Sequence, residues 1–365
     1  ADDSLFGDGR FAEFCDDNDY WLTPYATFCA LKDKFDGAPW QAWPEQYRSY
    51  SPRLADDPEL ALGIETACKL QFEFQQEWNE LRAYANERGV RIVGDMPMYV
   101  SADSADVWSE PDIFDLDEDG HAAMQAGAPA DPLSAEGQLW GNPTYDWDVL
   151  RSDGYDWWLR RLDRAFKLYD YVRLDHFIGF SSYYEIEAGK PATEGAYAFG
   201  PGTNLFRAAN KLFGGLPLIA EDLGDVTPAV RALIAETGVP GMSIVQFADQ
   251  DVRNEFTPNR GSVVYAGTHD TETLVGWCAR SFADGDAEKA VELARDIERR
   301  TIGVENDVVI MPLQDVLLLG NEARMNVPGV AEGNWTWQAN AADVEAATSW
   351  LRELADESGR AVEER

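Results

Sequence analysis

The chain has 365 residues, of which 45% are hydrophobic, so it is long enough to bury a large core. Its net charge of -36 argues against a nucleic-acid partner, because binding to phosphates requires a basic patch. The sequence also contains nothing close to the roughly 20 consecutive apolar residues that a membrane-spanning helix needs.

The acidic residues are spread along the whole chain, and lysine is scarce relative to arginine. Because salt screens the repulsion between surface charges, such a surface is suited to concentrated salt. We therefore expect a halophilic source, with an ordinary acidic cytoplasmic protein as the alternative. The four cysteines lack metal-ligand spacing and lie in apolar contexts, which predicts reduced thiols and a cytoplasmic location.

Residues 11–90 are predicted to be mostly helical, because apolar residues recur at three- and four-residue spacing over 26–32 and 64–88. A short buried strand at 90–97 leads into a long excursion over 98–147, which is rich in Asp, Ala, Gly and Pro. Five more strands are predicted at 171–175, 217–221, 243–247, 262–266 and 307–311. Helices are predicted at 157–168, 204–213, 227–237 and 341–356, with others between 270 and 300. This alternation predicts an α/β fold with a parallel sheet, although six strands are fewer than the eight that close a barrel.

Three carboxylates follow apolar, strand-like runs. Asp175 ends the run 171–174, Glu221 ends the run 216–220, and Asp270 comes shortly after the run 263–266. The carboxyl ends of the strands of a parallel barrel converge on one mouth, where the chemistry takes place. Because two carboxyl groups facing each other across a glycosidic bond can cleave it, the sequence predicts a glycoside-processing site in which the third carboxylate has another role.

The neighbours of two of these carboxylates predict different protonation states. Arg173 lies two residues before Asp175 on the same face of the strand, where a buried cation would keep Asp175 ionised, as a nucleophile must be. A structural ion pair between strands is the alternative role of Arg173. Glu221 follows Leu-Ile-Ala, and apolar neighbours would raise its pKa and keep it protonated as a general acid.

Two of the three histidines flank these carboxylates, because His176 follows Asp175 and His269 precedes Asp270. Imidazoles there would donate hydrogen bonds to sugar hydroxyls. A metal site is the alternative, but the usual paired histidines on one early strand are absent, so we expect neither a metal nor an organic cofactor. Trp140 is predicted to lie in a glycine-containing loop and to present a flat face to a sugar ring.

In their order and spacing, ten short segments resemble those of the 4-α-glucanotransferases called amylomaltase or disproportionating enzyme (glycoside hydrolase family 77), relatives of the α-amylases. The resemblance runs from about residue 20 to about residue 340 and rests on Gly94-Asp-Met-Pro97, Asp103-Ser-Ala-Asp-Val-Trp108, Gly137-Gln-Leu-Trp-Gly-Asn-Pro143, Arg173-Leu-Asp-His-Phe177, Ala220-Glu-Asp-Leu-Gly224, Pro240-Gly-Met242, Gly267-Thr-His-Asp270, Gln314-Asp-Val316, Glu322-Ala-Arg-Met-Asn326 and Gly333-Asn-Trp335.

The resemblance implies a role for each candidate residue. Asp175 is then the nucleophile, Glu221 the acid/base, and Asp270 the stabiliser of the transition state. The implied substrate-binding residues are Asp95, Trp140, Arg173, His176, His269 and Asn334. The implied partners are α-1,4-glucans such as maltodextrin, starch and glycogen.

The resemblance also implies a (β/α)8 TIM barrel of the α-amylase superfamily with helical insertions. Family members carry a further stretch before residue 1 that holds the first two barrel strands, so the chain as given is expected to lack them. We expect a helical insertion region at 1–89 and the catalytic barrel, from about its third strand, at 90–365, with a loop subdomain at 98–156. Because an open remnant would expose apolar sheet edges, residues 1–365 alone are expected to fold poorly and to be inactive.

The implied activity is the transfer of α-1,4-linked glucan segments between chains, by a retaining double displacement through a covalent glucosyl-enzyme. One alternative is an α-1,4-glucan hydrolase of the same superfamily. Another is an inactive, truncated homologue that only binds glucans. Thr271, Glu272 and Leu139 differ from the residues found in many family members, which leaves the acceptor preference open, and the sequence gives no oligomeric state.

Overall fold

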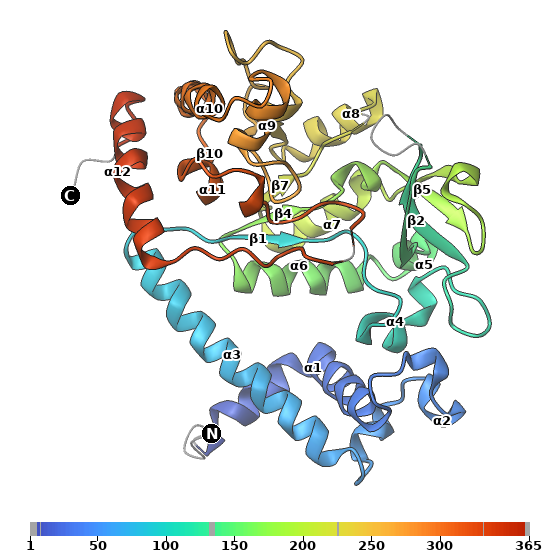
Figure 1. Cartoon of the computed structure of the whole chain (residues 1–365). Coiled ribbons are helices and arrows are strands. Elements are labelled where there is room, and N and C mark those ends of the chain that lie inside the picture. The colour runs from blue at the N-terminus through green and yellow to red at the C-terminus, as the bar shows by residue number, and fades with distance from the viewer. Residues whose placement is uncertain (1–5, 8, 131–135, 225, 331, 362–365) are drawn as a thin grey trace. The chain divides into compact units, whose positions relative to one another are not determined.

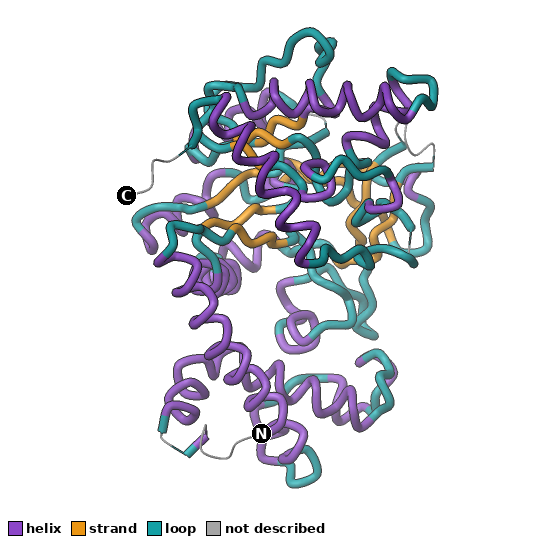
Figure 2. Tube along the Cα trace, turned by 60° about the vertical axis from the view of Figure 1, so that its left-hand side comes forward, coloured by secondary structure: helices purple, strands orange, loops and turns teal. Residues whose placement is uncertain are grey.

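The computed structural model describes residues 6–7, 9–130, 136–224, 226–330 and 332–361. The chain divides into two compact units, Ala1–Val239 and Pro240–Arg365, called here the N-terminal and C-terminal units. The helices and strands are labelled in Figure 1, and Figure 2 separates them by colour.

The N-terminal unit begins with helices and continues with strands and helices in alternation. Its helices are α1 (Arg10–Lys34), α2 (Glu45–Arg48), α3 (Ala61–Glu87), α4 (Ala105–Ser109), α5 (Trp147–Ser152), α6 (Asp156–Leu168), α7 (Thr203–Phe213) and α8 (Pro228–Thr237). Its strands are β1 (Val93–Met96), β2 (Met124–Ala128), β3 (Gln138–Pro143), β4 (Tyr171–Leu174), β5 (Ser182–Glu187), β6 (Ala196–Phe199) and β7 (Leu218–Ala220).

A parallel sheet in the order β1-β4-β7 forms the centre of the N-terminal unit. In its register Asp95 of β1 lies opposite Arg173 of β4, and Arg173 lies opposite Ile219 of β7. Every residue of β7 and the last three of β4 are buried, as expected of strands covered on both faces. The register therefore places the chain segments that follow β4 and β7 side by side.

A four-stranded antiparallel sheet in the order β3-β2-β5-β6 also belongs to this unit and was not predicted. Two of its strands lie within 98–147, for which the sequence predicted only a long connecting segment without strands. Gly127 of β2 explains part of the difference, because a side chain there would collide with the backbone of Gln138 and the side chain of Ile186. The close approach of the strands requires glycine, which weakens the strand signal in the sequence.

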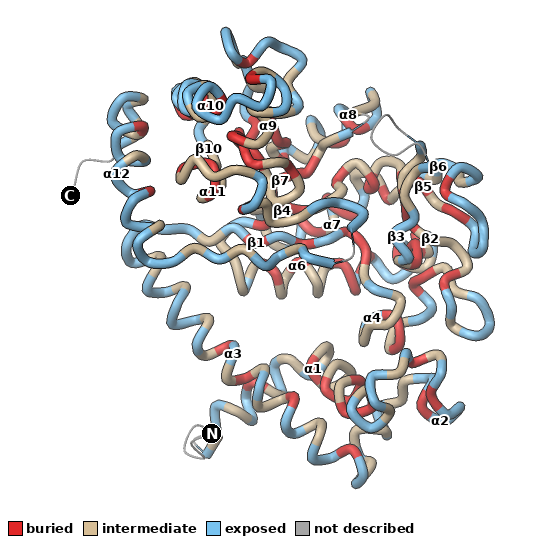
Figure 3. The backbone as a smooth tube through the Cα atoms, viewed as in Figure 1, coloured by how far each residue is buried: buried red, intermediate tan, exposed pale blue. Residues whose placement is uncertain are grey.

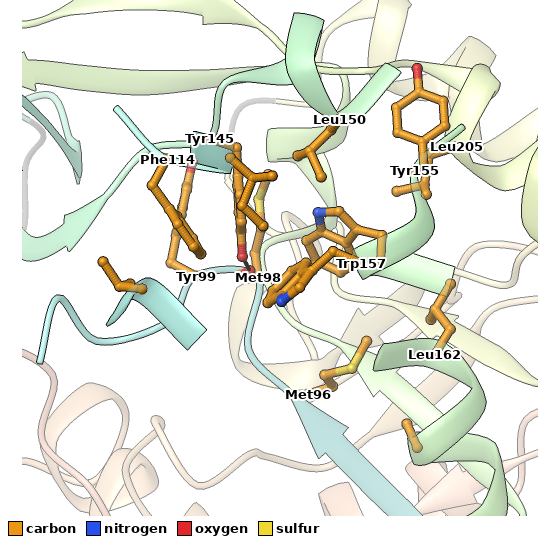
Figure 4. Packing of buried hydrophobic residues seen from close by; sticks show 14 of the residues in the cluster. Met96, Met98, Tyr99, Phe114, Tyr145, Leu150, Tyr155, Trp157, Leu162 and Leu205 are labelled. Atoms are coloured by element: carbon orange, nitrogen blue, oxygen red, sulfur yellow. Dashed lines mark hydrogen bonds between the residues drawn. The ribbon is translucent and has the colours of Figure 1, made fainter. Parts of the chain in front are cut away.

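Aromatic side chains make up much of the core of the N-terminal unit, and Figure 4 shows several of them. Figure 3 marks the buried parts of the backbone in red. Tyr145 is buried, stacks on Tyr99 with ring centroids 5.8 Å apart, and packs against Phe114 at 5.2 Å. Its hydroxyl donates a hydrogen bond of 2.7 Å to the carbonyl of Met98. This packing fixes the segment that leaves the carboxyl end of β1, close to the candidate site.

The C-terminal unit contains β8 (Met242–Ile244), β9 (Val263–Tyr265), α9 (Leu274–Ser281), α10 (Ala287–Ile302), β10 (Val309–Ile310), α11 (Leu313–Val316) and α12 (Ala341–Glu357). Its strands form a parallel sheet in the order β10-β9-β8. The predicted strand at 243–247 ends at Ile244, because Val245–Phe247 turns into a 3-10 helix. The packed faces of α9 and α10 contribute to a second hydrophobic core.

All six predicted parallel strands are present as β1, β4, β7, β8, β9 and β10, which confirms the α/β class. In the described part of the chain they form two three-stranded sheets, one in each unit, so no closed barrel is seen, and the (β/α)8 barrel that the resemblance implies remains an expectation. None of the described helices is both long enough and apolar enough to cross a membrane.

Candidate active site

Arg173 joins two carboxylates at the carboxyl end of the central sheet of the N-terminal unit. Its guanidinium lies 2.9 Å from Asp175 Oδ1 and donates to both oxygens of Asp95, at 2.8 and 2.9 Å. The Arg173 side chain is 9% exposed, whereas those of Asp95 and Asp175 are 45% and 42% exposed. A buried cation thus faces two carboxylates that are open to a ligand, as predicted from its place two residues before Asp175.

Glu221 directly follows β7 and is buried, with 8% of its surface exposed. Burial raises the pKa of Glu221 to about 7, and the charge of Asp175 acts in the same direction. Arg173 and the backbone N–H groups of Leu223 and His176 oppose this rise in pKa. The direction of the pKa shift predicted from its apolar neighbours is therefore confirmed.

His176 lies directly after Asp175 in a left-handed backbone conformation, with φ of 50°. This turn lets two consecutive N–H groups reach the segment after β7, since His176 donates to Glu221 Oε2 at 2.8 Å and Phe177 to the Glu221 carbonyl at 3.0 Å. Burial lowers the pKa of the His176 imidazole, against the effect of Asp175. Its Nε2 atom is buried and has no hydrogen-bond partner among the described residues, and its contact with a sugar hydroxyl remains a prediction.

Trp140 lies in strand β3 and not in a loop, which corrects the prediction. Flanking glycine suggested a loop, but this segment pairs with β2. The Trp140 ring is 39% exposed and packs edge to face on His176, with centroids 5.1 Å apart. Its Nε1 donates to Gln138 Oε1 at 3.0 Å. The structure therefore brings Trp140 to the residue next to Asp175, and its contact with a sugar ring remains a prediction.

The C-terminal unit holds the other predicted site residues. Asp270 follows β9, and its Oδ2 lies 3.0 Å from His269 Nε2, while its Oδ1 accepts a hydrogen bond of 2.6 Å from Asn326 Nδ2. The His269 ring lies 5.1 Å from that of Trp335. His269 and Asp270 are thus direct partners, and the donation from His269 to a sugar hydroxyl remains a prediction.

Asn334 organises the loop in which it lies. Its Oδ1 accepts from the backbone N–H of Val327 at 3.0 Å, and its Nδ2 donates to the carbonyl of Val330 at 2.8 Å. These contacts hold a loop in shape and do not themselves indicate a substrate contact. The substrate-binding role of Asn334 remains a prediction.

Asn326 and Arg324 are contacts of Asp270 that received no role from the sequence. Both lie in the segment 322–326 that contributed to the resemblance, yet they are 56 and 54 residues away from Asp270. No local pattern links positions so far apart, so only the folded structure identifies them.

Comparison with known proteins identifies the family of the chain. The family model described as 4-alpha-glucanotransferase matches residues 5–343. The chain belongs to this family.

Relatives in this family include the 4-alpha-glucanotransferase of Thermus thermophilus, which is 42% identical over 350 residues, covering 90% of this chain and 70% of the relative. The 4-alpha-glucanotransferase of Synechocystis is 43% identical over 354 residues, covering 90% of this chain and 69% of the relative. The chain thus spans about 70% of the length of these family members.

The fold is similar to that of the solved amylomaltase from Streptococcus agalactiae in complex with acarbose. The TM-score is 0.89 at 35% identity, over 97% of this chain and 75% of that one. The amylomaltase from Corynebacterium glutamicum shares the fold, with a TM-score of 0.71 at 18% identity, over 96% of this chain and 56% of that one. Within the described residues, no group of three or more His, Cys, Asp or Glu side chains could hold a metal ion.

Proposed function

We propose that this protein transfers α-1,4-linked glucan segments from one maltodextrin, starch or glycogen chain to another by a retaining double displacement. The observation that carries the proposal is the pairing of Asp175 with Glu221. Asp175 lies against the buried cation of Arg173, while burial raises the pKa of the neighbouring Glu221 to about 7. Two adjacent carboxyl groups in such different environments take the roles of nucleophile and acid.

In the first step an oxygen of Asp175 attacks the anomeric carbon of the donor sugar, and the glycosidic bond to the leaving 4-oxygen breaks. Glu221 gives its proton to that oxygen, so the departing glucan leaves with a neutral hydroxyl. The ion pair with Arg173 favours the ionised form of Asp175 that the attack requires. The products are a glycosyl ester on Asp175 and a Glu221 carboxylate.

Formation of the ester prepares Glu221 for the second step. The charge of Asp175 contributes to the raised pKa of Glu221, and the ester removes that charge. The pKa of Glu221 therefore falls once the intermediate has formed, which favours the carboxylate as a base. Glu221 then takes the proton from the 4-hydroxyl of an acceptor glucan, whose oxygen attacks the anomeric carbon and releases Asp175.

The remaining candidate residues would bind the sugar at the bond that is broken. We assign Asp270 to stabilisation of the transition state, and Asp95, Arg173, His176, His269 and Asn334 to contacts with the sugar hydroxyls. Trp140 would cover the acceptor side, where stacking on a glucose ring excludes water and favours transfer over hydrolysis. The partly exposed ring of Trp140 beside His176 supports this assignment.

We also propose that the two parallel sheets are parts of a (β/α)8 barrel of the α-amylase superfamily. In this arrangement residues 1–89 form the helical insertion region, 90–365 the catalytic barrel, and 98–156 its loop subdomain. The strands β1, β4, β7, β8, β9 and β10, each followed by a helix or a loop carrying candidate site residues, support this proposal. A cytoplasmic location is consistent with four cysteines that form no disulfide.

Incubation of the full-length protein with maltotriose tests the reaction. A transferase converts maltotriose into glucose and a ladder of longer maltodextrins, whereas the hydrolase alternative gives only shorter products. A protein that binds maltotriose without turnover would support the third alternative, a binding homologue without catalysis.

The variant Glu221→Gln tests the assigned roles. Without a base for the second step, a donor with a good leaving group should leave a glycosyl adduct on Asp175, detectable by the mass of the intact protein and of its peptides. Glu185→Gln is the matched control, because burial also raises the pKa of Glu185 in strand β5, outside the candidate site. An adduct on any residue other than Asp175 contradicts the assignment.

A further inference from the structure

Asp270 lies in a turn that is closed by its own side chains. Thr271 Oγ1 accepts a hydrogen bond of 3.0 Å from the N–H of Thr268, and Thr268 Oγ1 accepts one of 3.3 Å from the N–H of Asp270. A side chain at Gly267 would meet Thr271 Oγ1 at 2.7 Å, so the turn also requires glycine at its start. These contacts fix the backbone of the turn but leave the Asp270 carboxylate to be oriented by other groups.

A second segment of the chain supplies that orientation. Asn326 Nδ2 donates to Asp270 Oδ1 at 2.6 Å, and the N–H of Asn326 donates to the His269 carbonyl at 3.0 Å. Arg324 Nη2 donates to the Asp270 carbonyl at 2.7 Å, while its Nε donates to the Asn326 carbonyl at 2.8 Å. Arg324 and Asn326 thus hold each other as well as the backbone and side chain of the His269–Asp270 pair.

The two oxygens of the carboxylate have different partners. Asn326 donates a hydrogen bond to Oδ1, and His269 Nε2 lies 3.0 Å from Oδ2. An amide is a neutral donor that cannot itself accept a proton, so it fixes the rotation of the carboxylate at any pH. A carboxylate that must meet a charge developing on a sugar ring gains most from such fixed orientation, because it then needs no rearrangement during the reaction.

We propose that Asn326 and Arg324 are positioning residues of the reaction, which orient Asp270 for the transition state without touching the sugar. This inference rests on the role of Asp270 under the proposed function. It assigns the segment 322–326 a mechanistic role, in place of a purely structural one between α11 and the loop that contains Asn334. The change expected on loss of Asn326 is in kcat, because the orientation of Asp270 matters most when positive charge develops on the sugar.

The first test is Asn326→Ala in the full-length protein, assayed with maltotriose. Misplacement of a reacting group can cost up to about 100-fold in rate, and we expect a fall in kcat of that order with little change in KM. Asn306→Ala is the matched control, because the Asn306 amide also bridges backbone groups, those of Asn259 and Ser262 before β9. That variant is expected to lose thermal stability but to keep kcat.

The second test is Asn326→Asp, which keeps the shape of the side chain but replaces the donor with a carboxylate. Two carboxylates so close cannot both ionise without cost, so one proton shared between them restores the hydrogen bond as the pH falls. The ratio of kcat in this variant to that of the unchanged protein should rise about tenfold from pH 8 to pH 5. The ratio removes the titration of Glu221, which both proteins share.

Asp270→Asn is assayed in parallel to separate the two proposals. If Asp270→Asn abolishes transfer while Asn326→Ala and Asn326→Asp keep kcat within about twofold at every pH, the positioning role is overturned and the role of Asp270 stands. If Asp270→Asn keeps full activity, both are overturned. A large loss of kcat in Asn326→Ala together with the acid rescue of Asn326→Asp supports positioning, since a purely structural defect would not follow pH in this way.

Discussion

The backbone N–H of His176 donates a hydrogen bond of 2.8 Å to the carboxylate of Glu221. The turn that follows Asp175 therefore holds the proposed acid/base directly, and the two carboxyl groups of the proposed reaction depend on one stretch of backbone. The left-handed conformation of His176 makes this possible, because it aims two consecutive N–H groups at the segment after β7. Strained backbone of this kind is often found where geometry serves function.

The first prediction concerns the pH dependence of transfer. Glu221 must be protonated in the first step, and its pKa is raised to about 7. The protonated fraction is lost as the pH rises through that value, so kcat/KM for a donor should fall above about pH 7. Rates measured from pH 5 to pH 9 at low donor concentration provide the check. A kcat/KM that stays level up to pH 9 would contradict the assignment of Glu221 as the acid.

The second prediction is that Arg173→Met moves this fall in kcat/KM to higher pH. Arg173 lowers the pKa of Glu221, so removal of its charge should raise that pKa further, while the loss of the ion pair with Asp175 slows the reaction at every pH. Asp95→Asn is the control, because it removes a partner of Arg173 but keeps the cation beside Glu221. If the pH at which kcat/KM falls moves equally in both variants, Arg173 does not act through Glu221.

The third prediction concerns the choice between acceptor and water. Trp140→Ala should raise KM for the acceptor about tenfold, equivalent to about 1.4 kcal/mol, and should increase the share of hydrolysis. The readout is the ratio of longer maltodextrins to reducing ends formed from maltotriose. Phe199→Ala is the control, because Phe199 of β6 is also an exposed aromatic residue but has no role in the proposed reaction. An equal change in both variants would rule out a specific role for Trp140.

The sequence could predict the parallel strands and the two environments of the carboxylates because the relevant signals are local. Leu218, Ile219 and Ala220 come directly before Glu221, and the same residues that mark a buried strand also raise the pKa of its last carboxyl group. Arg173 is likewise two residues from Asp175. Such short-range patterns survive without knowledge of the fold.

The antiparallel sheet and the contacts of Asp270 depend on partners far along the chain, and for that reason they could not be predicted. Trp140 was expected in a loop because glycine follows it, but its strand forms through pairing with β2. Asn326 reaches Asp270 only once β9 and the segment after α11 have come together. Tertiary contacts of this kind override local propensity.

The fourth prediction addresses the acidic surface. With a net charge of -36, repulsion between surface carboxylates opposes folding, and molar salt reduces the range of that repulsion to about 3 Å. The midpoint of thermal unfolding should therefore rise between 0.1 and 2 M KCl. Sorbitol at matched osmolality is the control, since it stabilises proteins without screening charge. Equal stabilisation by both solutes would remove the argument for a halophilic surface.

The fifth prediction concerns Glu298 in α10, a carboxyl group that the proposed reaction does not use. Glu298 has no exposed surface, and its Oε2 accepts a hydrogen bond of 2.8 Å from Trp350 Nε1. Burial raises the pKa of Glu298 to about 8, and the nearby Asp315 adds to this effect. In the unfolded chain the same group ionises near its ordinary value, so the folded state binds the extra proton between about pH 4.5 and 8.

Because the folded state binds this extra proton, the stability of the protein should fall as the pH rises. The contribution of Glu298 to stability is fully present below the ordinary pKa and is lost as the pH rises through about 8, because the buried group must then ionise. Glu298→Gln keeps the acceptor for Trp350 but cannot ionise. Relative to the unchanged protein, the variant should gain on the order of 4 kcal/mol of stability between pH 5 and pH 9.

Thermal unfolding midpoints of both proteins across this pH range provide the measurement. Glu292→Gln is the matched control, because Glu292 lies on the same helix with its side chain exposed. The midpoint of Glu298→Gln is compared with that of the unchanged protein at each pH. If the difference between the two midpoints stays constant from pH 5 to pH 9, Glu298 is ionised in the folded protein. If the difference in midpoint grows with pH for Glu298→Gln but not for Glu292→Gln, the group that titrates is the buried carboxyl of Glu298.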